Sequence, residues 1–396
     1  MRLAIQGEST KELKRIMLIG LFFRICVLIF ILTIGEYFSE PYYISDDRTY
    51  ELLAKRYLEV AQSPYDLNAF KFIGAYGYLE VFWPWVMCIS AKLFGSIYIG
   101  RILNCFIAVA NIKLVYDLAM QVCENKTVAL RAAKLMAFLP VMIFVCCFPI
   151  KDIFLMYAVL NTFLLLVHWQ NNARISFYSI VWEAFLLLAI NHTRGAIVEA
   201  LFLIFVLFTI AKIKKSNNNA LVYIMLMVLF TMMIYNLTPI IEAFQVKVDT
   251  YGDVVETGNF IKVIQMRNPW EIYKLPFSYF YATLQPFLLN LFEFGGLSMW
   301  AFIINLANIT IYPIAIGNYI YIIMKKHNKL LWLSSTVLMA AISGLSLGNS
   351  RHYFFMMPYT ILNFCLAIER PNKICEYGIL IGPFVIFIIV ILMTAR

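Results

Sequence analysis

The sequence predicts an all-α polytopic membrane protein with about 11 transmembrane helices, built as a single integral membrane domain over residues 1–396. Of its residues, 62% are hydrophobic and only 14% are charged, and the mean hydropathy is +0.78. Apolar runs of about 17 to 25 residues, the length that crosses roughly 30 Å of hydrocarbon as a helix, recur along the chain. A soluble domain does not reach this composition.

Periodic apolar runs define the individual spans. The first run contains Arg24 and is followed by no small-residue cleavage site, so we expect it to be retained. Segments 79–95 and 276–294 carry proline and charged residues, and we expect them to lie at the membrane interface. The predicted spans are 17–35, 99–121, 133–149, 152–169, 178–190, 195–211, 220–238, 301–324, 330–347, 353–368 and 378–394.

Short basic loops indicate which side of the membrane each span end faces. With the N-terminus inside, the short inner pieces hold sixteen lysines and arginines against five acids. Because positive charge marks the cytoplasmic side, we expect a cytoplasmic N-terminus and an external C-terminus. The net charge of +9 then reflects topology and attraction to membrane lipids, and it indicates no nucleic-acid partner.

Two external loops are long, 36–98 and 239–300, and long loops on a tightly wound membrane protein usually carry function. The first contains SDDRTYELLAKRYLEV, which predicts an amphipathic helix on the membrane surface with Leu53, Tyr57 and Val60 on one face. Asp46 and Asp47 stand at its start. One acid suffices to cap the helix, so the other is either solvated or available for chemistry.

Charged side chains also stand at the outer ends of later spans. Such charge is costly and marks a polar cavity. Each cation alone also suits snorkelling to lipid headgroups, but three cationic turns on one face, opposite the acidic pair, suit an anionic phosphate. The residues are Lys151 and Asp152 in FPIKD, His192 and Arg194 in NHTRG, and Arg351 and His352 in GNSRHYF.

Polar residues inside the spans are a weaker signal. Lys113 and Asp117 are four residues apart on one helix and are predicted to pair. Arg24, Glu183 and Glu199 either pair internally or line a path. The cysteines lie mostly inside apolar runs with no CxxC spacing, so we expect neither a disulfide framework nor a structural metal.

Several short motifs follow one another in a suggestive order. SDDRTYELLA is followed by an amphipathic segment ending in LFG and by GRILN at the start of a span. AFLPVMIFVCCFPIKD combines an apolar stretch, a proline and an outer acid, and NSRHYFFMMPYTIL opens a late span. In order and sidedness these motifs resemble the bacterial C-type (GT-C) glycosyltransferases. The likeness is to polyprenyl-phosphate-sugar enzymes such as the lipid A aminoarabinose transferase and the protein O-mannosyltransferases.

The resemblance implies an inverting glycosyltransferase of the bacterial inner membrane that works on the outer face. Its donor would be a polyprenyl-phosphate-linked sugar. Its acceptor would be a lipid-linked glycan or another cell-surface molecule, as in lipopolysaccharide biosynthesis. By position, Asp46 corresponds to the family's first-loop acid, which is associated with the acceptor or a metal, and Asp152 to the acid after the third span. Asp47 would then be the helix cap.

The residue types suit this chemistry. Displacing a polyprenyl phosphate leaves an anion that lysine or arginine stabilises. The acceptor hydroxyl needs a carboxylate base within hydrogen-bond reach, which Asp46 or Asp47 would supply. No resident cofactor is identified. A divalent metal ion would help to hold the phosphate, but the sequence defines no ligand set for one.

Other functional classes remain open at this point. An O-antigen or capsule polymerase also joins polyprenyl-linked glycans on the outer face, and Arg194 and Arg351 would then grip the carrier pyrophosphate. A lipid-linked oligosaccharide flippase or transporter would spread ionisable residues through the midplane and repeat its broken helices. Here the charge gathers on one face and no repeat is found. A noncatalytic assembly partner is the remaining alternative.

The predicted topology is tested by cysteine labelling in a cysteine-free background. Ser216→Cys lies in a basic loop expected inside, and Tyr251→Cys in a long loop expected outside. An impermeant thiol reagent applied to intact cells should label position 251 and spare position 216. Labelling of 216 without 251 would overturn the topology.

Overall fold

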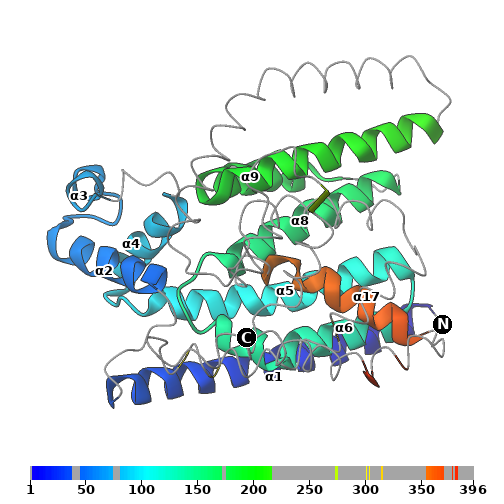
Figure 1. The fold of residues 1–396 in the computed structure, drawn as a ribbon, viewed down its shortest axis with the longest axis horizontal. Helices are drawn as coiled ribbons and strands as arrows, with labels where there is room; N and C mark the ends of the chain where they lie inside the picture. The colour runs from blue at the N-terminus through cyan, green and yellow to red at the C-terminus, as the bar shows by residue number, and fades with distance from the viewer. Residues whose placement is uncertain are drawn as a thin grey trace.

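The computed structural model describes residues 2–37, 45–74, 81–171, 175–215 and 354–369, with short pieces at 273–274, 300, 303, 314, 377 and 380–381. Within these ranges six helices run side by side as a bundle, and three others form a lobe at one end (Figure 1). The bundle helices are α1 (Arg2–Tyr37), α5 (Ile99–Cys123), α6 (Lys126–Phe138), α8 (Asp152–Gln170), α9 (Phe177–Lys215) and α17 (Met357–Glu369). The lobe consists of α2 (Ser45–Val60), α3 (Leu67–Phe72) and α4 (Phe82–Phe94).

Three helices are long and apolar enough to cross a membrane: Lys11–Gly35 within α1, α5 and α8. They coincide with the predicted spans 17–35, 99–121 and 152–169. The described part of the chain is therefore all-helical and contains three candidate membrane spans. Apart from the short pieces named above, the loop 239–300 and the predicted spans 220–238, 301–324, 330–347 and 378–394 lie outside the described residues.

The helix α5 is the centre of the bundle, because it packs against α1, α6 and α8. Cys105, Ile112 and Val115 are among its buried side chains. At its start α5 approaches α4 so closely that a Cβ on Gly100 would lie 2.0 Å from the Met87 sulfur. Because Gly100 has no side chain, the start of α5 can lie directly against the lobe.

The predicted span 133–149 is broken in the structure. It divides into α6, which ends at Phe138, and the short helix α7 (Pro140–Val145). Leu139 between them is extended, with ψ 122°, because a residue before proline is disfavoured in the helical conformation. The rest of the segment forms a turn, residues 146–151, that leads into α8. A single straight helix over 133–149 was the wrong expectation.

The helix α9 reverses direction at Arg194, whose backbone is extended, with φ −163° and ψ 88°. Its first half runs antiparallel to α8, since Glu183 receives a hydrogen bond from Thr162. Its second half runs parallel to α8, since Phe205 stacks on Trp169 with ring centroids 5.8 Å apart. Within the described residues, the chain therefore turns back between the predicted spans 178–190 and 195–211.

The lobe has its own small core. Leu53 and Tyr57 of α2 are buried in this core, whereas Val60, predicted to share their face, is 40% exposed and lies off the buried face. Asp66 caps α3 by accepting hydrogen bonds from the backbone N–H groups of Asn68 and Ala69, at 3.1 Å each. Hydrogen bonds from backbone N–H groups hold the pKa of Asp66 below its usual value, and the bond from Gln62 has the largest effect.

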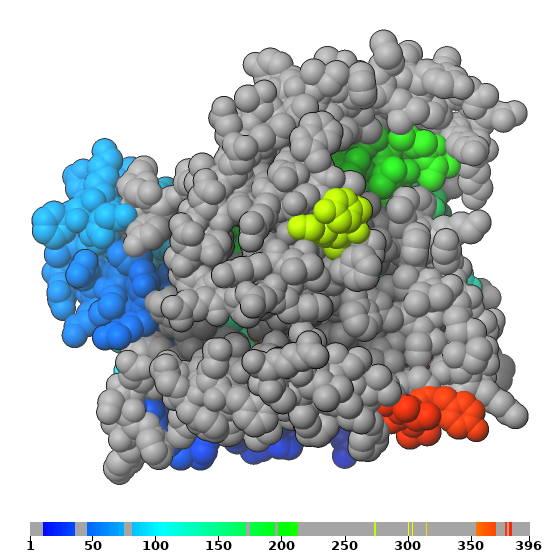
Figure 2. All heavy atoms as spheres, in the orientation of Figure 1, coloured from blue at the N-terminus to red at the C-terminus, as the bar shows by residue number. Residues whose placement is uncertain are grey.

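The two ends of the bundle are distinct. The lobe sits where α5 and α8 begin and where α9 reverses, and it projects from the body of the molecule (Figures 1 and 2). At the far end, Lys134 pairs with Glu12 at 2.9 Å and Arg131 with Glu369 at 3.4 Å. All four residues belong to the short pieces 1–15, 123–134 and 369–377, which the basic-loop pattern predicts to be cytoplasmic, and the structure brings them to one end.

Candidate functional site

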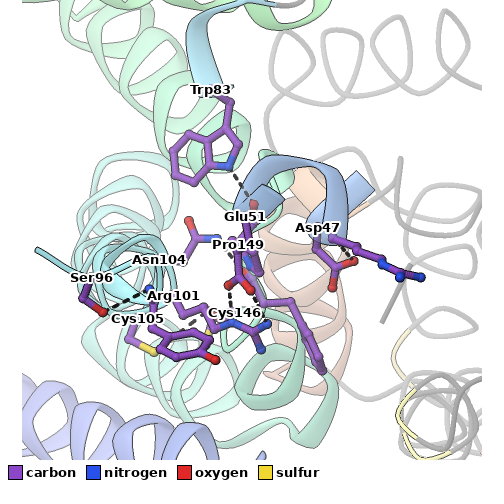
Figure 3. A network of polar contacts seen from close by, with 12 residues as sticks. Asp47, Glu51, Trp83, Ser96, Arg101, Asn104, Cys105, Cys146 and Pro149 are labelled. Carbon is purple, nitrogen blue, oxygen red and sulfur yellow. Dashed lines mark hydrogen bonds and ion pairs between the residues drawn. The ribbon is translucent and has the colours of Figure 1, made fainter. Parts of the chain in front are cut away.

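A buried ion pair joins the lobe to the bundle. Arg101 Nε of α5 lies 2.6 Å from Glu51 Oε1 of α2, and Arg101 Nη2 lies 3.0 Å from Glu51 Oε2 (Figure 3). Both side chains are fully buried. Two parallel N–H···O bonds fix position and rotation together. The pair therefore sets where the acidic end of α2 lies against the bundle.

Arg101 also contacts the turn that precedes α8. Its guanidinium carbon lies 5.7 Å from the centroid of the Phe148 ring and 5.8 Å from that of Tyr98. An arginine at this distance from an aromatic ring is attracted to the ring electrons. Arg101 thus connects the helix that carries Asp47 to the turn that leads to Asp152.

Side chains of the lobe and of α5 hold the carbonyl groups of this turn. Asn104 donates to the carbonyl oxygens of Phe148 at 2.7 Å and Ile150 at 2.9 Å. Trp83 of α4 donates from its indole Nε1 to the carbonyl of Pro149 at 2.7 Å (Figure 3). Three successive carbonyls are fixed in this way. Because Asp152 is the first residue of α8, the start of that helix is fixed with them.

Asp152 and Arg194 face each other at the lobe end of the bundle. Asp152 Oδ1 lies 3.6 Å from Arg194 Nη1, and the Asp152 side chain is fully buried. The position at the N-terminus of α8 favours a carboxylate because the helix dipole is positive there. Neither carboxylate oxygen of Asp152 accepts a hydrogen bond from the residues that the structure describes.

The predicted cationic turns differ in exposure. Lys151 directly precedes Asp152 and is 4% exposed. Arg194 is buried beside Asp152, whereas His192 is exposed. The structure therefore brings Lys151, Asp152 and Arg194 to one place. Arg351 and His352 lie outside the described residues.

The two acids of α2 also differ. The helix begins at Ser45, so both acids lie in its first turn. Asp47 is fully buried and its Oδ1 accepts a 2.9 Å hydrogen bond from the Arg48 backbone, while Asp46 is only half-buried. Asp47 is one helical turn before Glu51 and shares its face. Burial thus distinguishes Asp47, and the roles predicted for Asp46 as reacting acid and Asp47 as cap remain predictions.

Sequence reasoning did not identify Glu51 and Arg101 as site residues. The spacing of Glu51 from Asp47, four residues on a predicted helix, placed both acids on one face. Arg101 stood inside GRILN, at the start of a long apolar span where an unpaired charge is costly. These two signals together indicate partners. The two residues are about fifty positions apart in sequence, and only the packing of α2 against α5 brings them into contact. Local sequence patterns do not predict such a long-range contact.

Charges of both signs are concentrated at the lobe end. Burying an ion costs several kcal/mol, and the cost is offset only by a partner with good geometry. Ionisable groups at such depth mark a functional site more often than a structural one. Buried there are the acids Asp47, Glu51 and Asp152 and the bases Arg101, Lys151 and Arg194.

Among the described residues, three potential metal ligands lie close together: Cys105, Cys146 and Cys147, whose ligand atoms are within 4.8 Å of one another. Magnesium and calcium prefer oxygen ligands, and magnesium is often held by one or two carboxylates together with waters and substrate phosphates. A divalent metal ion that helps to hold the phosphate stays a prediction.

Comparison of the chain with protein-family models, with curated proteins and with solved structures finds no match.

The buried ion pair predicts a large asymmetry in stability. Glu51→Ala leaves the Arg101 guanidinium buried without its carboxylate, which should lower the free energy of unfolding by about 3–5 kcal/mol. Glu51→Met combined with Arg101→Met should recover most of that loss, because no unpaired charge remains. Reversible unfolding in mixed detergent micelles measures both variants.

The matched control is Glu12→Ala, which breaks the Lys134–Glu12 pair, whose side chains are 53% and 41% exposed. An exposed pair contributes about 0–1 kcal/mol. If Glu51→Ala costs no more than Glu12→Ala, the pair does not hold the lobe.

Proposed function

We propose that this protein is a membrane-embedded glycosyltransferase that moves a sugar from a polyprenyl-phosphate donor to a glycan or other cell-surface acceptor. The observation that carries the proposal is Asp152, a fully buried carboxylate beside Arg194 that accepts no hydrogen bond from the described residues. An ionised carboxylate has about four acceptor positions. A substrate hydroxyl is a suitable donor for them.

The basic residues around Asp152 suit a phosphate. Arg194 presents a planar guanidinium, which binds two oxygens of a phosphate at once, and Lys151 adds a point charge next to it in the chain. Both side chains are mostly buried, so their charges are screened less by water than at an open surface. The same end of the bundle is predicted to face outward, where a polyprenyl carrier presents its phosphate.

The proposed reaction is a displacement at the anomeric carbon. The acceptor hydroxyl forms a new bond to that carbon while the bond from the carbon to the phosphate oxygen breaks, so the sugar inverts its configuration. Asp152 accepts the hydroxyl proton. Polyprenyl phosphate leaves with the electron pair, and Arg194 and Lys151 stabilise the charge that develops on it. The proton later passes from Asp152 to solvent.

In the proposed arrangement, the acids of α2 line the site on the side of the lobe. Asp47 is buried on the face of α2 that Glu51 and Arg101 hold against the bundle. Its carboxylate is suited to orienting an acceptor with several hydroxyls. The less buried Asp46 takes a secondary part.

The proposal includes the orientation of the chain. Eleven spans, a cytoplasmic N-terminus and an external lobe follow from the distribution of basic loops. Among the described helices, the connection of α5 to α6 and the end of α17 share one end of the bundle, which agrees with this alternation. A bacterial inner membrane is the compartment in which such an enzyme meets its carrier.

The decisive experiment follows the donor in cells. A strain without the gene should accumulate a polyprenyl-phosphate-linked sugar, which mass spectrometry of the lipid extract identifies. The wild-type gene should clear it. Asp152→Asn keeps the shape but removes the base, so turnover should fall by about 100-fold or more. Arg194→Lys keeps the charge and loses the two-donor geometry, so turnover should also fall.

Asp117→Asn is the matched control, because Asp117 pairs with Lys113 on the exposed side of α5, as the sequence predicted. It should leave turnover unchanged. Asp47→Asn should impair turnover more than Asp46→Asn. The proposal fails if Asp152→Asn, expressed at the wild-type level, clears the donor normally. It also fails if the mutant strain keeps single glycan units and loses only long chains, which is the phenotype of a missing polymerase.

A further inference from the structure

Three cysteine sulfurs meet inside the bundle, where the turn that precedes α8 lies against α5. Cys105 comes from α5, and Cys146 and Cys147 follow α7 directly. Their Sγ atoms all lie within 4.8 Å of one another, and each residue is fully buried. Figure 3 shows Cys105 and Cys146 on the same side of the polar network as Arg101. The transferase site does not use these sulfurs.

The spacing suits a three-coordinate metal ion. Sulfurs placed around a central ion at about 2.3 Å are about 4.0 Å apart in a trigonal arrangement. The sulfurs, which lie within 4.8 Å of one another, therefore need to approach by at most about 0.8 Å, a shift that small side-chain rotations can supply. The described residues add no fourth histidine, cysteine or carboxylate to this group. A tetrahedral zinc site needs four ligands, so the geometry favours an ion that accepts three.

Arg24 places a positive charge beside the sulfurs. It is fully buried in α1, and Cys147 donates from its Sγ to the backbone carbonyl of Arg24 at 3.4 Å. Nη1 and Nη2 donate to the carbonyls of Ala137 and Met136, each at 2.9 Å, which anchors the group. Its Nε has no hydrogen-bond partner among the described residues. The charge of Arg24 would offset the negative charge that metal binding leaves on thiolates.

We propose that Cys105, Cys146 and Cys147 form a buried site for a soft monovalent cation, Cu(I), with Arg24 as the charge-compensating neighbour. Thiolates are soft ligands that select Cu(I) over magnesium, calcium or manganese. The apolar surroundings exclude water, which disfavours oxidation of Cu(I). The site would link the start of α8 to α5 through the backbone that runs from Cys147 to Asp152, in addition to the hydrogen bonds that Asn104 and Trp83 donate to that turn.

Each thiol also has an ordinary hydrogen-bond acceptor. Cys146 and Cys147 donate to the carbonyl of Ile143 at 3.1 Å and 3.2 Å, and Cys105 lies 3.8 Å from the carbonyl of Cys146. Three neutral thiols bound in this way would be simple packing residues. The two states differ in one measurable property, the affinity for Cu(I).

The test is an anaerobic Cu(I) titration of the reduced, detergent-solubilised full-length protein against a chromophoric Cu(I) chelator. One Cu(I) per chain should bind, and X-ray absorption should show three sulfur neighbours at about 2.3 Å. Cys105→Ser, Cys146→Ser and Cys147→Ser should each weaken the affinity by on the order of 100-fold, since one ligand is lost.

Cys88→Ser and Cys365→Ser are the matched controls, because both residues are buried and lie outside the cluster. They should bind Cu(I) as the wild type does. The melting temperature of each variant, measured without copper, identifies any variant that fails to fold. Arg24→Met, which leaves the three cysteines intact, should also weaken Cu(I) binding. The proposal is wrong if the wild type binds no more Cu(I) than the triple Cys105, Cys146 and Cys147 serine variant.

Discussion

The ion pair between Glu51 and Arg101 is the interaction on which the candidate site depends. It places a charged helix of the lobe against the central helix of the bundle with no exposure to solvent. Because the pair is buried, loss of either partner would leave the other charge unpaired, at a large cost in the free energy of folding. Asp47 gains its buried position from this contact, since it shares a helix face with Glu51.

The same arginine links the lobe to the start of α8. Its ring contact with Phe148, together with the hydrogen bonds from Asn104 and Trp83, fixes the turn that delivers Asp152. In the proposed transferase, fixing this turn would keep the start of α8 in place when a substrate binds, which is a condition for efficient electrostatic catalysis. The reversal of α9 then brings Arg194 to the same point, so residues far apart in sequence converge on one small volume.

Local sequence patterns predicted much of this fold, but they could not predict contacts between distant segments. Hydropathy located α5 and α8, and the polar turn before Arg194 correctly marked a reversal, because both depend on neighbouring residues. The break before Pro140 also had a local signal, because a residue that precedes proline disfavours the helical conformation. The prediction overlooked it, since residues 133–149 form one continuous apolar run. The pairing of Glu51 with Arg101 depends on helix packing, and no periodicity encodes it. For the same reason the sequence did not reveal that Cys105 meets Cys146.

The most direct test of this account is the position of a bound carrier. A cryo-electron microscopy structure of the full-length protein with polyprenyl phosphate would show the phosphate density. We expect the phosphate at the lobe end, within hydrogen-bond distance of Arg194 or Lys151 and next to Asp152. A phosphate at the opposite end of the bundle, away from Asp152 and Arg194, would contradict the account.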